Sequence, residues 1–138
     1  MASANDHIAD FDVLCEKLPH VHADWFRTLD EARWDRAVSD LRSRIVSMPN
    51  ERALFELSAL CALAGDAHTG VDLQGSGIPM MAMPLGFEAF DDGVFVVLAG
   101  PLESGNLAAK LTAVNGVPTG EVIERIGRLI ATDNPGRL

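Results

Sequence analysis

The stretch from Glu51 to Val71, ERALFELSALCALAGDAHTGV, marks the point where the chain changes from a helical to a β-like sequence. Its first part predicts a helix over 51–64, and one face of that helix carries Leu54, Leu57, Leu60, Cys61 and Ala64. The other faces are mostly small or apolar, which predicts the central and most buried helix. Gly65 suits the C-terminal end, where a left-handed residue is often needed.

The sequence before this stretch predicts two further amphipathic helices. The first has apolar residues at helical spacing up to Pro19, which is expected to end it: Ile8, Phe11, Leu14, Cys15 and Leu18. A link from His20 to Phe26 follows. Thr28 and Glu31 then have the spacing of a capping box. The second helix has its own apolar stripe: Trp34, Val38, Leu41, Ile45 and Met48. Residues 1–66 are therefore predicted to form a helical domain.

The sequence after the stretch predicts a small β-rich domain over 67–138. A short strand is expected at Val71–Leu73, and longer strands at 83–90 and 94–99, on either side of the turn sequence Asp91-Asp92-Gly93. A further strand at 110–114 is broken by Asn115-Gly116, and a last helix begins near Thr119 and runs toward Asp133. The predicted fold class is α+β: a three-helix layer, then a small β unit with one closing helix.

Composition excludes several classes of function. The net charge of −9 leaves no basic patch for phosphates, so neither nucleic acid nor an anionic membrane is an expected partner. No segment has the length or apolar character of a membrane span, and no signal peptide begins the chain. The expected location is therefore the cytoplasm, unless a leader was removed. Cys15 and Cys61 have no metal-ligand spacing and are expected to be reduced core residues, with a single bridge as the alternative.

The loop that contains His68 is the first candidate site. It follows directly on a buried helix, and an imidazole is the side chain suited to proton transfer near neutral pH. On spacing alone, a structural or simply exposed histidine is the more common case. The neighbouring glycines do not form a phosphate loop, because no Lys-Ser/Thr pair follows them.

The pair His20 and His22 is the second candidate. On an extended segment both rings would point to one side, but no third ligand is positioned by any spacing rule. A surface or packing role is preferred for this pair, so neither a metal nor another cofactor is expected.

The order of these motifs resembles the front part of tail-specific, or C-terminal-processing, serine peptidases, which include the tricorn-core branch. The resemblance rests on Gly65-Asp-Ala-His-Thr69 at the end of a buried helix, with Ala67 where many members have glycine. It continues through Met83-Pro-Leu-Gly-Phe87, Asp92-Gly-Val-Phe-Val96 and Lys110-Leu-Thr-Ala-Val-Asn-Gly-Val-Pro118. The last of these motifs, with the helix that follows it, is similar to a PDZ-like module, in which a strand leads into Val-Asn-Gly before a helix.

The resemblance implies roles for individual residues. In the tricorn-like branch the histidine of this loop is a general base, which assigns His68 as catalytic and Asp66 and Thr69 as supports of the loop. In other branches a Ser–Lys dyad acts without such a histidine. Either branch implies a nucleophile in a C-terminal catalytic α/β domain beyond Leu138.

Leu85, Gly86 and Phe87 resemble a loop that binds the C-terminal carboxylate of a peptide, although an ordinary strand is the simpler interpretation. The predicted function is thus the N-terminal, not independently catalytic portion of a serine-type peptidase that acts on peptide or protein substrates. The alternative is a peptide-binding or structural interaction module without catalysis. The sequence leaves open the substrate specificity, the oligomeric state and whether the chain is a natural product.

Overall fold

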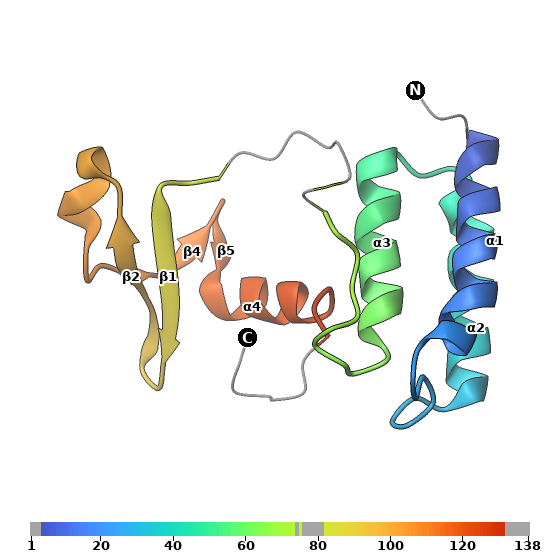
Figure 1. The fold of residues 1–138 in the computed structure, drawn as a ribbon. Coiled ribbons are helices and arrows are strands. Elements are labelled where there is room, and N and C mark those ends of the chain that lie inside the picture. Colours follow the sequence, from blue (N-terminus) through green and yellow to red (C-terminus); the bar gives the residue numbers. More distant parts are fainter. Residues whose placement is uncertain (1–3, 74, 76–81, 132–138) are drawn as a thin grey trace.

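The computed structural model describes residues 4–73, 75 and 82–131. The chain has an α+β fold in which three N-terminal helices precede a small antiparallel sheet and a closing helix (Figure 1). The elements are α1 (Ala4–Val21), α2 (Glu31–Ile45), α3 (Asn50–Ala62), β1 (Leu85–Phe90), β2 (Gly93–Ala99), a 3₁₀ helix η1 (Pro101–Asn106), β3 (Lys110–Leu111), β4 (Ala113–Val114), β5 (Val117–Pro118) and α4 (Thr119–Gly127).

The three helices and the link between α1 and α2 enclose one hydrophobic core. Its largest fully buried side chains are Trp25, Phe11 and Ile45. The Trp25 and Trp34 rings meet edge to face with centroids 5.0 Å apart, a favourable arrangement for two aromatic rings. The apolar stripe predicted for α2 is confirmed, because Trp34, Leu41 and Ile45 are all buried in this core.

The predicted N-cap of α2 is wrong. Asp30, not Thr28, caps the helix, and its carboxylate accepts a hydrogen bond from the Arg33 N–H at 3.0 Å. The Thr28 hydroxyl instead donates to the Ala64 carbonyl at 3.0 Å, beyond the end of α3. An aspartate directly before the helix is a strong cap, which leaves the threonine free to make this tertiary contact.

The predicted end of the first helix at Pro19 is also wrong, because α1 continues to Val21 and includes this proline. A proline removes one N–H donor and crowds the carbonyl four residues earlier, but it leaves later donors intact. The His22 N–H still donates to the Leu18 carbonyl at 3.1 Å, so one more turn forms. His20 therefore lies on the helix, not on an extended link.

α3 is less buried than its composition predicts. Ala53, Ser58, Leu60 and Cys61 are buried, but Leu57 is only half-buried and Phe55 is 39% exposed. One side of α3 packs on α2, whereas its other side borders an open hollow that Phe55 and Ala59 line together with Leu129, past the end of α4.

The β unit is a hairpin with short additions. β1 and β2 pair antiparallel from Leu85↔Ala99 to Phe90↔Gly93, with a bulge between Gly86 and Phe87, and β2 also pairs with β3. β4 and β5 form a separate two-stranded ladder. Its turn is Asn115-Gly116, with φ values of 50° and 80°, as a two-residue hairpin turn requires.

Three details of the predicted second half differ from the structure. The single strand predicted over 110–114 is two short strands, β3 and β4, which belong to different sheets. Val71–Leu73 is not a strand, because none of the described strands pairs with it and a strand needs a hydrogen-bonded neighbour. The closing helix α4 ends at Gly127, a poor helix former, so Leu129 and Ile130 lie past its end. The expected end near Asp133, like the loop Gln74–Gly77 except for Gly75, lies outside the described residues.

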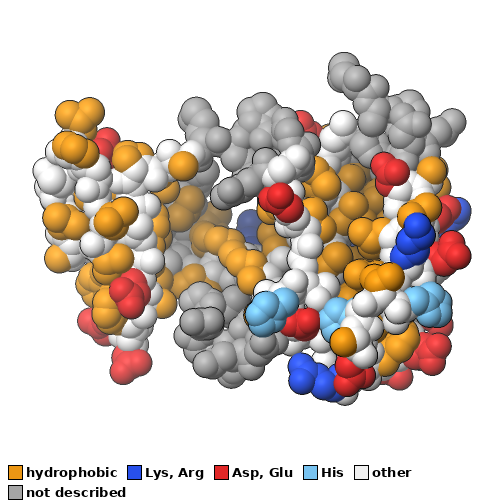
Figure 2. Space-filling model, in the orientation of Figure 1, with side chains coloured by type: hydrophobic (Ala, Val, Ile, Leu, Met, Phe, Trp, Pro, Cys, Tyr) orange, Lys and Arg blue, Asp and Glu red, His pale blue; other side chains and the backbone are white. Residues whose placement is uncertain are grey.

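Burial differs sharply between the two halves. Of the described residues after Ala64, only Val96 and Ala131 belong to the buried hydrophobic set. In the space-filling view, hydrophobic side chains cover much of the visible surface of the β hairpin, whereas charged side chains gather over the helical part (Figure 2). Within the described ranges, no helix is both long and apolar enough to cross a membrane.

Candidate active site

The loop from Gly65 to Thr69 is held by the end of α3. Gly65 has φ +65°, a left-handed conformation that glycine adopts without strain, and it turns the chain out of the helix. Immediately before it, the Ala64 carbonyl accepts the Thr28 hydroxyl. The loop therefore starts from a backbone position that both α3 and the α1–α2 link fix in place.

The Asp66 carboxylate accepts the hydrogen bonds that hold the loop together. Its Oδ1 accepts hydrogen bonds from the backbone N–H of His68 at 2.9 Å and from His68 Nδ1 at 3.2 Å. Its Oδ2 accepts from His22 Nε2 at 2.8 Å and from the Thr69 hydroxyl at 3.1 Å. The backbone N–H of His68 is the main reason that the pKa of Asp66 lies well below its usual value, and the hydrogen bond from His22 adds to the effect. Asp66 is therefore an ionised carboxylate at neutral pH.

The His68 ring is exposed to solvent, and a contact with Asp66 orients its Nδ1 atom. The His68 side chain is 89% exposed, and Nδ1 lies against the Asp66 carboxylate. Nε2 has no hydrogen-bonding partner in the part of the chain that the structure describes. An ionised carboxylate only accepts hydrogen bonds, so Nδ1 must carry the proton, and the lone pair of Nε2 is then available in the neutral ring. This is the tautomer that a general base requires.

The structure thus brings the three predicted loop residues together. Asp66 bonds to both of the others, through the His68 ring and backbone and through the Thr69 hydroxyl. The Thr69 backbone N–H also donates to the Asp66 carbonyl at 3.0 Å, which closes a tight turn.

His22 is a member of this cluster that the sequence did not assign to it. Its ring is 16% exposed and packs edge to face on Trp25, with centroids 5.3 Å apart. The signal was present in the pair His20-Val-His22, but the extended conformation assumed for it is wrong. Because α1 continues through Pro19, residues two apart point in different directions, so that His20 is exposed and His22 turns inward.

A hollow of about 300 Å³ lies beside Asp66. It is lined by His22, Ala23, Asp24, Arg27, Ala64 and Asp66. Asp66 and His22 therefore belong to its wall, whereas His68 is not one of its lining residues.

No nucleophile is hydrogen-bonded to His68 among the described residues. The hydroxyls of Ser43, Ser47 and Ser104 donate to backbone carbonyls three residues earlier, and Ser58 is buried in α3. Both cysteines are free thiols, and burial raises the pKa of Cys15 to about 12. Such a thiol is almost entirely protonated at neutral pH and is therefore a poor nucleophile.

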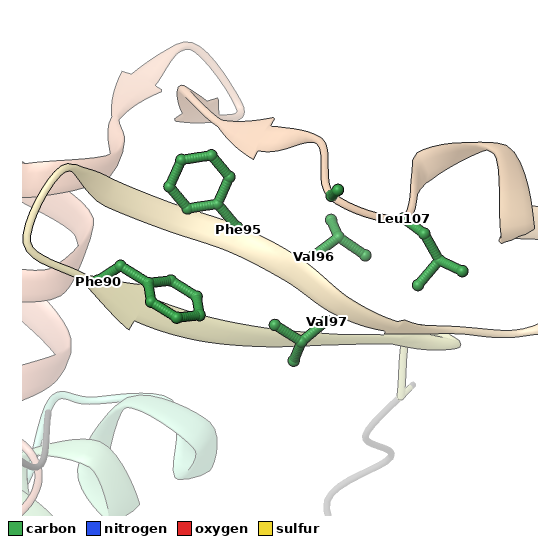
Figure 3. Close-up of a pocket in the computed structure, with 6 residues that line it drawn as sticks. Phe90, Phe95, Val96, Val97 and Leu107 are labelled. Atoms are coloured by element: carbon green, nitrogen blue, oxygen red, sulfur yellow. The ribbon is translucent and has the colours of Figure 1, made fainter.

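The residues considered for peptide binding lie in the hairpin. Leu85, Gly86 and Phe87 belong to β1, where they pair with β2 around the bulge. An open apolar groove of about 540 Å³ lies elsewhere on the hairpin, lined by Phe90, Phe95, Val96, Val97, Leu107 and Ala108 (Figure 3). The rings of Phe90 and Phe95 meet edge to face in it, with centroids 5.8 Å apart.

Over the described ranges, no group of three or more His, Cys, Asp or Glu side chains is arranged to hold a metal ion. His22 already uses both ring nitrogens for hydrogen bonds, one toward Asp66 and one toward the Asp24 N–H. Comparison of the chain with other proteins adds no family assignment: no family model, no curated protein and no solved structure matches it.

Proposed function

We propose that this chain is the N-terminal portion of a serine-type peptidase of the tail-specific kind, in which His68 is the general base. The observation that carries the proposal is the contact of 3.2 Å between His68 Nδ1 and the ionised Asp66, which leaves Nε2 open to solvent. A general base needs one free nitrogen and a partner that fixes the other.

The chemistry follows from this arrangement. His68 Nε2 accepts the proton of an attacking serine hydroxyl and later returns it to the leaving amine. Asp66 keeps the ring in the correct tautomer and stabilises the imidazolium that forms between the two transfers. The nucleophile and the donors of the oxyanion hole belong to a catalytic α/β domain outside these 138 residues, as the sequence resemblance implies.

The β unit is proposed to present the substrate to this site as a PDZ-like module. Its hairpin, the Asn115-Gly116 turn and the following α4 occur in the order that the resemblance implies. In the described sheet β1 lies at the edge, because it pairs with β2 alone. An edge strand has backbone groups available to an extended peptide.

The test is peptide hydrolysis by the protein extended through the catalytic domain. His68→Ala is expected to reduce kcat roughly 100- to 10,000-fold, the usual contribution of a general base. His20→Ala is the matched control, since His20 is exposed on α1 and is expected to leave turnover unchanged. Wild-type turnover in His68→Ala would exclude the base role and would favour a Ser–Lys branch.

A second candidate function is peptide binding without catalysis, and the open edge of β1 favours it. Its test is a titration of the chain with short peptides that end in a free or an amidated C-terminus, followed by the backbone resonances of Leu85, Gly86 and Phe87. Shifts that require the free carboxylate, together with no hydrolysis in the extended protein, would establish this function in place of the first.

A further inference from the structure

The two oxygens of the Asp66 carboxylate accept hydrogen bonds from two different histidines. Among the hydrogen bonds described, Oδ1 accepts from the backbone and ring N–H groups of His68, whereas Oδ2 accepts from His22 and Thr69. Each oxygen therefore accepts two hydrogen bonds. A carboxylate held in this way cannot rotate about its Cβ–Cγ bond without breaking the contacts of both oxygens at once.

The hydrogen bonds of His22 fix its own protonation state. Its Nδ1 lies 3.1 Å from the backbone N–H of Asp24, which can only donate, so Nδ1 is the acceptor and carries no proton. Nε2 faces the ionised Asp66 at 2.8 Å, so Nε2 carries the proton and donates it. His22 is therefore the neutral Nε2–H tautomer.

His22 also connects the loop to the rigid part of the molecule. Its ring packs on Trp25, which is fully buried and in turn packs on Trp34 of α2. Thr69 donates to the same carboxylate oxygen, but it belongs to the loop itself and moves with it. His22 lies 44 residues earlier in the chain, so its bond ties the Asp66 carboxylate to the segment that packs into the helical core.

From this geometry we infer that His22 is a positioning residue for His68: it holds Oδ2 of Asp66 so that Oδ1 stays aimed at the His68 Nδ1–H. The inference rests on the proposed function, since it concerns the orientation of the proposed base. His22 acts through Asp66, since its two ring nitrogens are engaged by the Asp66 carboxylate and the Asp24 N–H. Its effect is to keep the exposed imidazole of His68 in the Nδ1–H tautomer, with Nε2 free to accept a proton.

Three variants separate this role from simple packing. His22→Phe keeps a ring against Trp25 but removes the donor to Asp66. His22→Gln loses the ring but keeps an amide N–H that can reach the same oxygen. His20→Phe is the matched control, because it alters an exposed histidine two residues away that makes no contact with Asp66 among the described residues.

The first readout is the ¹⁵N chemical shifts of the histidine rings in this chain at neutral pH. We expect His68 to be mainly Nδ1–H in the wild type, in His22→Gln and in the control, and to shift to a mixture of tautomers in His22→Phe. Unchanged His68 shifts in folded His22→Phe would overturn the inference. If that variant does not fold, the wild type decides: an Nδ1–H tautomer at His22 would overturn it, and an Nε2–H tautomer would support it.

The second readout is turnover by the protein extended through the catalytic domain. We expect His22→Phe to lower kcat roughly 10- to 100-fold with little change in KM, as misplacement of a catalytic group does, and His22→Gln to restore most of it. If His68→Ala abolishes turnover but His22→Phe changes neither kcat nor the His68 tautomer, the general-base role of His68 is supported and the positioning role of His22 is wrong. If His68→Ala keeps full turnover while His22→Phe still shifts the tautomer, the proposed function is wrong and the coupling between the two histidines is purely structural.

Discussion

The helical layer and the β unit have similarly apolar sequences but reach very different degrees of burial. In the helical layer the aromatic and branched side chains meet in one core that contains Phe11, Trp25 and Ile45. In the β unit, side chains of the same kind remain at the surface, and Leu98 of β2 is 68% exposed. The hairpin consists of a single sheet with its apolar side chains on both faces, and two or more layers are needed to bury them.

This difference in burial shows which part of the molecule can fix the positions of the candidate catalytic side chains. The candidate catalytic loop starts from α3 and is tied to the α1–α2 link by two hydrogen bonds, one from Thr28 to Ala64 and one from His22 to Asp66. Its supports thus belong to the half that has a core. The β unit, by contrast, offers open strand and groove surfaces, which suit a role in contacting a substrate or another domain.

The largest expected effect tests whether the core lies only in the helical layer. Trp34→Ala removes a buried ring that packs on Trp25 and should lower the free energy of unfolding by about 3–5 kcal/mol. Leu98→Ala removes a mostly exposed side chain and should cost about 0.5 kcal/mol or less. Urea unfolding followed by circular dichroism measures both. Equal losses would mean that the hairpin is packed as tightly as the helices.

Thiol reactivity gives the next largest effect. Burial raises the pKa of Cys15 to about 12, with Asp12 and Cys61 as weaker causes, so few of these thiols are ionised at pH 8. We expect Cys15 to react with Ellman's reagent roughly 10- to 1,000-fold more slowly than a free thiol, the range reflecting the greater nucleophilicity of high-pKa thiols. A cysteine introduced by Leu98→Cys, in the open hairpin, is the control and should react at an ordinary rate. Rapid labelling of Cys15 would mean that the helical layer opens readily.

A smaller effect distinguishes the two polar contacts at the ends of helices. Asp30→Ala should lower the free energy of unfolding by about 1 kcal/mol, the usual cost of a lost N-cap, and should speed amide exchange at Arg33. Thr28→Ala should cost about 0.5–1.5 kcal/mol through the lost bond to Ala64, without affecting Arg33. Hydrogen exchange measured by NMR separates them. Faster amide exchange at Arg33 in Thr28→Ala would show that Thr28 is the N-cap after all.

The smallest expected effect is the pH dependence that comes from Asp66. Its folded-state pKa is depressed below the ordinary value of 3.8, so its ionised form adds stability that is complete above that value and is lost as the pH falls through the lower, folded-state pKa. The difference in urea midpoint between the wild type and Asp66→Asn should therefore be full at pH 6 and should shrink below about pH 4. A difference that stays constant down to pH 2 would show that the charge of Asp66 does not stabilise the fold.

Much of the fold could be predicted from local patterns. The α2 stripe, the hairpin around Asp91-Asp92 and the Asn115-Gly116 turn all follow from spacing and turn chemistry, which act between neighbours in the chain. The errors occurred where a distant contact competed with a local rule. Thr28 has the spacing of a cap but bonds to Ala64, and α3 has the composition of a fully buried helix but leaves Phe55 39% exposed.

The candidate site shows the same division. The local sequence was enough to predict that Asp66, His68 and Thr69 share one short loop after a helix, because residues so close in the chain cannot be separated. That His22 donates to the same carboxylate, and that the His68 ring is exposed, became clear from the folded structure alone. A hydrogen bond across 44 residues depends on how the helices pack, and the extension of α1 past Pro19 changes the direction in which His22 points.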